Sequence, residues 1–146
     1  AMPDAWADVI IVDAFDGAQV PGELATVECL DELRRVARNE AVVIYNVTDR
    51  APFAWGKRLA GGLAERWPHL FLGAEPVVHK GKRFGNVVLV GSDARPDLAG
   101  IERESRRVSV GYRWITGRDA KAWAGGAQPF VDGEAEPSPG PAGRGW

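Results

Sequence analysis

The sequence is poor in the residues that make disulfide bonds and metal sites. Cys29 is the one cysteine among 146 residues, so no disulfide bond can form within the chain. A single unpaired cysteine is typical of a reducing compartment, and we expect a cytoplasmic protein. With Cys29, the two histidines His69 and His79 do not have the spacing of metal ligands. The sequence therefore predicts no metal site.

Long apolar runs and an excess of positive charge are also lacking. A membrane-spanning helix needs roughly 18 apolar residues in a row, and the longest apolar runs here are much shorter. The start of the chain has no basic region followed by an apolar one, so no signal peptide is predicted. The net charge of −2 argues against general nucleic-acid binding, for which a basic domain is typical. We expect neither a membrane nor a nucleic acid as a partner.

The composition is otherwise that of a globular protein with a packed core. Apolar residues make up 45% of the chain and charged residues 26%, which is close to the average for globular domains. The length suits one domain, which we place at residues 1–131. Residues 132–146 are rich in proline and glycine and are predicted to be a disordered tail.

Strands and helices alternate along this domain. Within residues 8–13, the consecutive β-branched residues Val9 to Val12 are typical of a strand that is covered on both faces. The segment "AVVIYNV" at 41–47 is predicted to be a second buried strand of this type. A helix is predicted from Thr26, as its N-cap, to about Arg38, and Asn39–Glu40 is predicted to be a turn. A second helix is predicted from Pro52 to about Trp67.

The remaining pattern adds two strands and two helices. Residues 69–75 are predicted to be a strand, and residues 77–92 a hairpin with its tip at Lys80–Lys82. Surface helices are predicted over 97–108 and 116–123, the second with a capping box. The order predicts an α/β fold class, with a mostly parallel sheet, an antiparallel C-terminal hairpin at its edge and helices on both faces.

Polar side chains follow the first two predicted strands, at the sheet edge where ligands bind in such folds. Asp13, Asp16, Asn46 and Asp49 all lie there. Asp13 is a candidate general base, and Asp16 is close enough in the turn to face the same ligand. The alternative is that Asp13 caps a backbone amide and Asp16 is a solvated turn residue. For Asp49 we expect a structural role, as a helix cap or an ion pair with Arg50.

Four segments of the sequence together resemble a known family: "DVIIVDAFDG", "VPGELATVECL", "RNEAVVIYNVTDR" and "RFGNVVLVGSD". Across residues 6–93 they are similar to the C-terminal half of the spermidine synthases, the polyamine aminopropyltransferases. This family has the Rossmann-like fold of S-adenosylmethionine-dependent methyltransferases. The resemblance implies that the chain is a partial, methyltransferase-type domain of this kind.

The resemblance also assigns roles to individual residues. In the family, an Asp-Ser-Ser-Asp-Pro-like segment supplies an acid that deprotonates the attacking amine and a second acid that binds the diamine. Asp13 and Asp16 match these two positions. The next loop packs near the adenine and thioether of the nucleoside, and the matching residues here are Val20, Pro21 and Leu24.

The sequence departs from the family pattern around the acceptor. Ala14, Phe15 and Gly17 replace the Ser-Ser and Pro of the acidic segment. His79 stands where the family has a tyrosine that contacts the polyamine, and basic residues surround it: Lys80, Lys82 and Arg83. Such a basic turn is usually solvated. If it faces the substrate, it would repel a cationic diamine and favour an acidic or neutral acceptor.

The glycine-rich turn that holds the nucleoside in the family has no counterpart in these 146 residues. We therefore expect the chain to bind no cofactor by itself and not to catalyse aminopropyl transfer alone. In a complete fold, decarboxylated S-adenosylmethionine or S-adenosylmethionine would be the co-substrate. The alternative is a non-catalytic remnant that binds a ligand or partner. In either case the strand at 8–13 has an open apolar edge, which predicts a homodimer.

Overall fold

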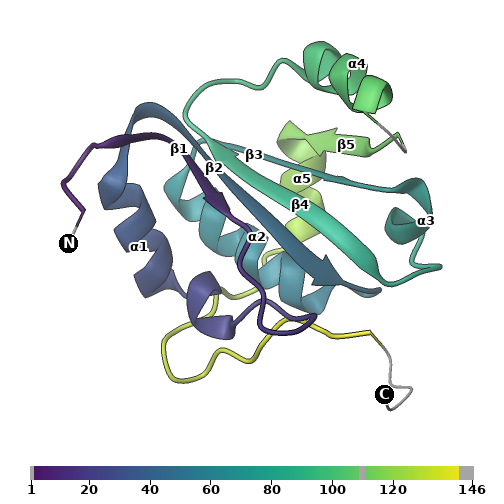
Figure 1. Cartoon of the computed structure of the whole chain (residues 1–146), viewed down its shortest axis with the longest axis horizontal. Helices are drawn as coiled ribbons and strands as arrows, with labels where there is room; N and C mark the ends of the chain where they lie inside the picture. Colours follow the sequence, from purple (N-terminus) through teal and green to yellow (C-terminus); the bar gives the residue numbers. More distant parts are fainter. Residues whose placement is uncertain (1, 109–110, 142–146) are drawn as a thin grey trace.

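The computed structural model describes residues 2–108 and 111–141, which form a five-stranded sheet with helices packed on it (Figure 1). The order across the sheet is β1-β2-β4-β3-β5. The strands are β1 (Ala7–Val12), β2 (Ala37–Asp49), β3 (His69–Ala74), β4 (Gly85–Ser92) and β5 (Arg113–Thr116). The helices are α1 (Val27–Val36), α2 (Ala54–Arg66), α3 (Pro76–His79), α4 (Leu98–Val108) and α5 (Gly117–Ala124), with a 3₁₀ turn at Gly22–Ala25.

The strand directions correct one part of the predicted architecture. The α/β class is confirmed, and β1 pairs with β2 in parallel as the intervening helix predicts. However, β4 lies between β2 and β3 and is antiparallel to both, and β5 is antiparallel to β3. The expectation of a mostly parallel sheet with an antiparallel strand at its edge is therefore wrong. The apolar run of β4 pairs on both sides when it lies inside the sheet, whereas an edge position would leave half of its backbone groups unpaired.

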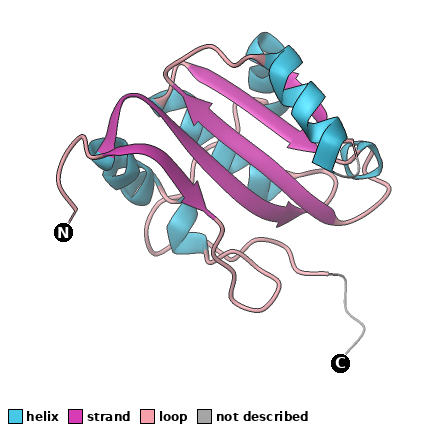
Figure 2. Cartoon of the chain, turned by 45° about the horizontal axis from the view of Figure 1, so that its top comes forward, coloured by secondary structure: helices cyan, strands magenta, loops and turns pink. Residues whose placement is uncertain are grey.

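One face of the sheet carries the hydrophobic core. Cross-strand neighbours such as Tyr45, Leu89 and Leu72 lie in one row across β2, β4 and β3, and each is fully buried. The helices α1, α2 and α5 cover this face, as Figures 1 and 2 show from two directions. From Ala41 to Val47, buried residues of β2 alternate with half-buried ones, which is the two-residue period of a strand.

The opposite face is covered only in part by the described residues. Near β5, the ring of Trp114 packs on Phe71, and its Nε1 donates to Ser105 Oγ of α4 at 3.0 Å. At the other end, β1 is the edge strand, with Val9 54% and Ile11 65% exposed. The prediction that this strand is covered on both faces is wrong for this chain, whereas the predicted open edge is present.

The local predictions hold where a side chain supplies the signal. Thr26 is the N-cap of α1, and its Oγ1 accepts a hydrogen bond from the Cys29 N–H at 3.3 Å. The predicted turn at Asn39–Glu40 is wrong, because both residues lie inside β2, which begins at Ala37. Only the φ of 67° at Glu40 and the shift of register with β1 mark this position. The helices at 97–108 and 116–123 are confirmed as α4 and α5.

Two local predictions need correction. The first arm of the predicted hairpin is not a strand, because Pro76 starts the short helix α3 and only the second arm forms a strand, β4. The capping box of α5 does not form, since the side chain of its N-cap Thr116 makes no capping hydrogen bond. Thr116 instead ends β5, a strand that the sequence pattern did not predict.

The segment predicted to be a disordered tail is packed over residues 132–141. Ser138 is fully buried, and its N–H donates to the Val20 carbonyl at 2.9 Å. The proline and glycine composition suggested that this segment has too little apolar surface to fold, but backbone and hydroxyl hydrogen bonds hold it against the loop before α1. Residues 142–146 of the predicted tail lie outside the described residues.

In residues 2–108 and 111–141, no helix is both long enough and apolar enough to cross a membrane. Within the same ranges, no three histidine, cysteine or acidic side chains are grouped as ligands for a metal ion.

Candidate functional site

Asp13 lies directly after β1, where its side chain is exposed at the carboxyl end of the strand. Its Oδ1 accepts a hydrogen bond from Asn46 Nδ2 at 2.9 Å, and Asn46 Oδ1 accepts one from Asn86 Nδ2 at 3.0 Å. These three side chains come from the residue after β1, from β2 and from β4, which are neighbours in the sheet. The amide of Asn46 is therefore held from both sides and fixes the orientation of the Asp13 carboxylate.

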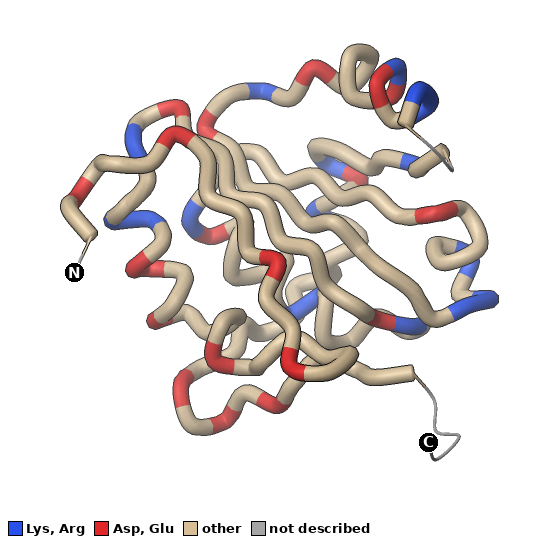
Figure 3. Tube along the Cα trace, in the orientation of Figure 1, with Lys and Arg blue, Asp and Glu red and all other residues tan. Residues whose placement is uncertain are grey.

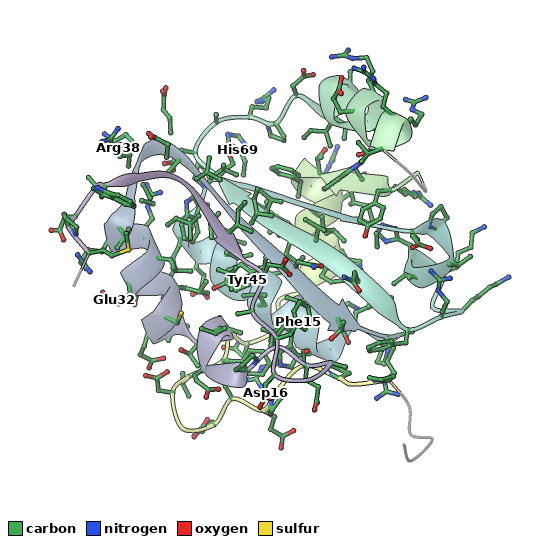
Figure 4. All side chains as sticks on the ribbon, viewed as in Figure 1. Phe15, Asp16, Glu32, Arg38, Tyr45 and His69 are labelled. Atoms are coloured by element: carbon green, nitrogen blue, oxygen red, sulfur yellow. The ribbon has the colours of Figure 1, made fainter. Side chains whose placement is uncertain are left out.

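Asp16 stands in a tight turn of the same loop. Its N–H donates to the Gln19 carbonyl at 2.9 Å, and the Gln19 N–H donates back to the Asp16 carbonyl at 3.2 Å. Gly17 has a φ of 62°, which a glycine adopts without strain. Figure 4 labels Asp16 and Phe15 on this loop, below the end of β1. Asp13 and Asp16 thus lie in one exposed loop.

The continuation of this loop carries the three residues predicted to contact a nucleoside. The Val20 side chain is 1% exposed and lies in the core. Pro21 and Leu24 are partly exposed, and the Leu24 carbonyl accepts a hydrogen bond from the Tyr45 hydroxyl at 2.7 Å. Of the three, Pro21 and Leu24 thus have side-chain surface that a ligand can reach in this structure.

His79 is not next to the loop that carries Asp13 and Asp16. It ends α3, after β3, and its ring Nε2 lies 2.8 Å from the Arg113 carbonyl of β5. β2 and β4 separate β3 from β1 in the sheet, so the ends of β1 and β3 are about 14 Å apart at the usual strand spacing. The basic turn beside His79 is shown in blue between α3 and β4 in Figure 3, where Arg83 pairs with Glu75.

Asp49 has the structural role that the sequence predicted. Its Oδ2 accepts the Gly56 N–H at 2.7 Å and its Oδ1 accepts the Arg50 N–H at 2.8 Å, so the carboxylate caps the first turn of α2. Burial raises the pKa of Asp49, and these two amide hydrogen bonds oppose the increase. Cys29 is half-buried in α1, and burial raises the pKa of its thiol.

A cleft of about 660 Å³ lies between α2 and the segment 134–140. Gln19, from the loop that carries Asp13 and Asp16, lines one side of it. Its walls include the aromatic rings of Trp55 and Phe130, and the Arg58 guanidinium lies over the Phe130 ring at 4.0 Å. The sequence analysis missed this cleft because it predicted the C-terminal segment to be disordered. It also gave no partner to Asn46, since Asn86 lies on a strand far along the chain.

Among the comparisons with known proteins, the one with solved structures finds proteins that are similar to this chain. No protein-family model matches the sequence, and no curated protein matches it. Among solved structures, the chain is similar to a probable spermidine synthase from Corynebacterium glutamicum ATCC 13032, with a TM-score of 0.83 and 29% sequence identity. The match covers 91% of this chain and 50% of that protein, so the chain spans half of its length. The chain thus has the α/β fold of a spermidine synthase-like transferase.

Proposed function

We propose that this chain is the acid-bearing half of a spermidine synthase-like transferase site, with Asp13 as its general base. The observation that supports this most is the hydrogen bond from Asn46, which orients an exposed carboxylate at the carboxyl end of β1. The similarity of the fold to that of a probable spermidine synthase is a second support for the proposal. In this role Asp13 takes a proton from the attacking amine of the acceptor.

The reaction that fits this role is the transfer of a group from a sulfonium to an amine. The amine nitrogen forms a bond to the carbon next to sulfur, and the carbon–sulfur bond breaks with its electron pair moving to sulfur. The proton lost from nitrogen goes to Asp13 Oδ2, since Oδ1 is the oxygen that accepts from Asn46. Decarboxylated S-adenosylmethionine or S-adenosylmethionine would be the group donor. Asp16 would bind the acceptor, and Pro21 and Leu24 would line the nucleoside side.

Turnover also needs groups that this chain does not supply. A glycine-rich turn to hold the nucleoside is not found in the sequence. We therefore propose that the chain presents Asp13 and the loop 13–24 but does not turn over substrate alone. His79 lies beside β5, at the far side of the sheet from Asp13. Its proposed contact with the substrate therefore requires an acceptor that is long enough to extend along this edge of the sheet.

Calorimetric titration tests this proposal. Methylthioadenosine, the expected nucleoside product, is titrated into the chain, into Asp13→Asn and into Asp119→Asn as a control on the exposed surface of α5. We expect weak but saturable binding by the chain and by Asp119→Asn, through the loop 13–24. Without the glycine-rich turn, the chain should not hold the nucleoside tightly as a resident cofactor. A second titration adds a diamine to the methylthioadenosine complex, and we expect Asp13→Asn to lose this step. A chain that binds neither ligand would contradict the proposal.

A non-catalytic module is the second candidate, and the open face beside β1 favours it. The Val9 and Ile11 side chains are more than half exposed on an edge strand, which is the kind of surface that pairs with a second copy. This candidate predicts a homodimer and no binding of methylthioadenosine. The two candidates therefore give opposite results in the titration.

A further inference from the structure

The C-terminal segment 134–140 lies across the loop that carries the candidate site residues. Ser138 and Val20 form a two-way contact: the Val20 N–H donates to Ser138 Oγ at 2.8 Å, and the Ser138 N–H donates to the Val20 carbonyl at 2.9 Å. Gln19 Nε2 also donates to the Ser138 carbonyl at 2.7 Å. In Figure 1 the yellow C-terminal segment runs beside the purple loop that follows β1. This segment is thus hydrogen-bonded to the loop that begins at Asp13.

Two buried hydroxyl groups lie at the centre of this contact. Ser138 is 0% and Thr48 6% exposed, and their hydroxyl oxygens are 3.1 Å apart. Thr48 Oγ1 is also within hydrogen-bond distance of the carbonyls of Ala18 (3.2 Å) and Pro139 (3.1 Å). One arrangement satisfies every group: the Val20 N–H donates to Ser138, Ser138 donates to Thr48, and Thr48 donates to one of these carbonyls. The network joins β2, the loop and the C-terminal segment.

The backbones of the segment and the loop also approach too closely for a side chain. A Cβ atom on Gly22 would lie 2.3 Å from the Ala135 carbonyl oxygen. Trp55 Nε1 donates to the Glu136 carbonyl at 2.9 Å, which fixes the segment to α2 on its other side. The segment is therefore held at both the loop and α2, and it cannot shift without breaking one of these contacts.

We propose that Ser138 and Thr48 are positioning residues, which hold the loop 13–21 in the geometry that binds the nucleoside and the acceptor. This inference rests on the proposed function for the role of the loop. If ligand binding requires the loop to be held, then binding must in turn hold the segment more firmly, because coupling between two sites is reciprocal. Order in the C-terminal segment is thus part of the binding site, although the side chains of the pair are buried.

Amide hydrogen exchange followed by NMR tests whether the hydroxyl pair holds the loop. The reporters are the amides of Val20 and Ser138, and the Tyr45 amide in β2 is the reference. We expect Ser138→Ala and the isosteric Thr48→Val to speed exchange at both reporters about tenfold, the value of one hydrogen bond of ordinary strength. Thr48→Ser keeps the hydroxyl and should restore the wild-type rate.

Two further variants make the exchange experiment independent of global unfolding. Gln19→Ala removes a bond to Ser138 from an exposed position and should speed exchange at Ser138 to a smaller extent. Ser105→Ala removes a hydroxyl on α4 and should leave both reporters unchanged. Wild-type rates at Val20 and Ser138 in Thr48→Val, or an equal increase at Tyr45 in every variant, would overturn the inference.

Titration with methylthioadenosine then tests the link to the site. We expect about tenfold weaker binding by Thr48→Val, wild-type binding by Thr48→Ser, and slower Ser138 exchange in the wild-type complex. Equal binding by Thr48→Val and wild type, with a loosened loop, would overturn the positioning role. If wild type does not bind this nucleoside, the proposed function fails, and the exchange rates still decide whether the pair holds the loop.

Discussion

The two faces of the sheet differ in what covers them. On the face under α1, α2 and α5, the side chains of β2, β3 and β4 are almost completely buried, with Tyr45 and Leu72 at 0% exposure. On the other face, Trp114 and α4 cover the β5 end, whereas Ile11 on β1 is 65% exposed. Both faces are built from similar β-branched and aliphatic residues. Burial here therefore depends on which elements are available to pack, and composition alone does not decide it.

The difference has an energetic consequence. A buried side chain stabilises the folded state through the apolar area that it removes from water, about 25 cal/mol for each Å². An exposed side chain of the same type removes little area and contributes little. Substitutions on the two faces should therefore have very different effects on the free energy of unfolding, and the following experiments measure this difference.

The largest effect is expected from the covered face. Leu72→Ala removes a fully buried side chain next to Leu89 in the central row of the sheet. We expect a loss of about 2–5 kcal/mol in the free energy of unfolding, measured by urea denaturation. Val9→Ala on the open face is the matched control, with an expected loss below about 0.5 kcal/mol. Similar losses for both variants would show that the open face is covered in solution.

The contact between the loop and the C-terminal segment comes next. Gly22→Ala places a methyl group 2.3 Å from the Ala135 carbonyl oxygen, so one of the two backbones must move. We expect a loss of about 1–3 kcal/mol, the usual cost of overpacking. Gly111→Ala is the control, because a Cβ there has no heavy atom within 4 Å. A Gly22→Ala variant as stable as the control would argue against a fixed C-terminal segment.

The buried carboxylate of Asp49 should have a smaller effect that depends on pH. Asp49→Ala removes the cap of α2, at an expected cost of about 1 kcal/mol. Because burial raises the pKa of Asp49 in the folded state, the folded protein binds the proton more tightly than the unfolded chain. The stability that Asp49 adds to the folded state through this proton is therefore fully present below the unfolded pKa of about 4. It is lost as the pH rises through the folded pKa.

The measurement for Asp49 is the difference in unfolding free energy between wild type and Asp49→Ala at several pH values. We expect this difference to be larger near pH 4 than near pH 7, since the Ala variant has no proton to bind at this position. Other carboxylates cancel in the difference if they are distant from Asp49. A difference that increases with pH would show that the amide hydrogen bonds outweigh burial.

The smallest effect on stability is expected at the open edge of β1. Ile11→Lys should change the free energy of unfolding by less than about 0.5 kcal/mol, because the side chain is already exposed. Light scattering gives the second readout. If β1 pairs with a second copy, wild type should be a dimer and Ile11→Lys a monomer, since charge at an edge opposes pairing. A monodisperse wild-type monomer would contradict the predicted homodimer.

Local sequence signals predicted the elements that depend on near neighbours. The Thr26 cap and the end of α2 at Arg66, before Pro68, both involve residues a few positions apart. The acids at the end of β1 were also found in this way. The sequence placed Asn46 at the same edge as Asp13 but did not predict what orients its side chain. The Asn86 amide that donates to Asn46 comes from β4.

The two errors over β4 and the C-terminal segment share a cause, which is long-range pairing. The position of β4 inside the sheet depends on its fit between β2 and β3, and no local pattern reports this. The C-terminal segment has a composition typical of disorder, yet Ser138 lies 118 positions from the Val20 amide that it binds. Hydrogen bonds of this kind replace the apolar burial that the segment lacks.

The sequence by itself determined most of the segments that form strands and helices, though not α3 or β5, because periodicity, caps and proline positions act over a single turn or strand. It also determined that two acids end the first strand. Only the tertiary structure decided which strand lies at the sheet edge, which side chain orients Asp13, and whether residues 132–141 are ordered. These depend on contacts between distant segments, whose free energy is gained only when the whole sheet has formed.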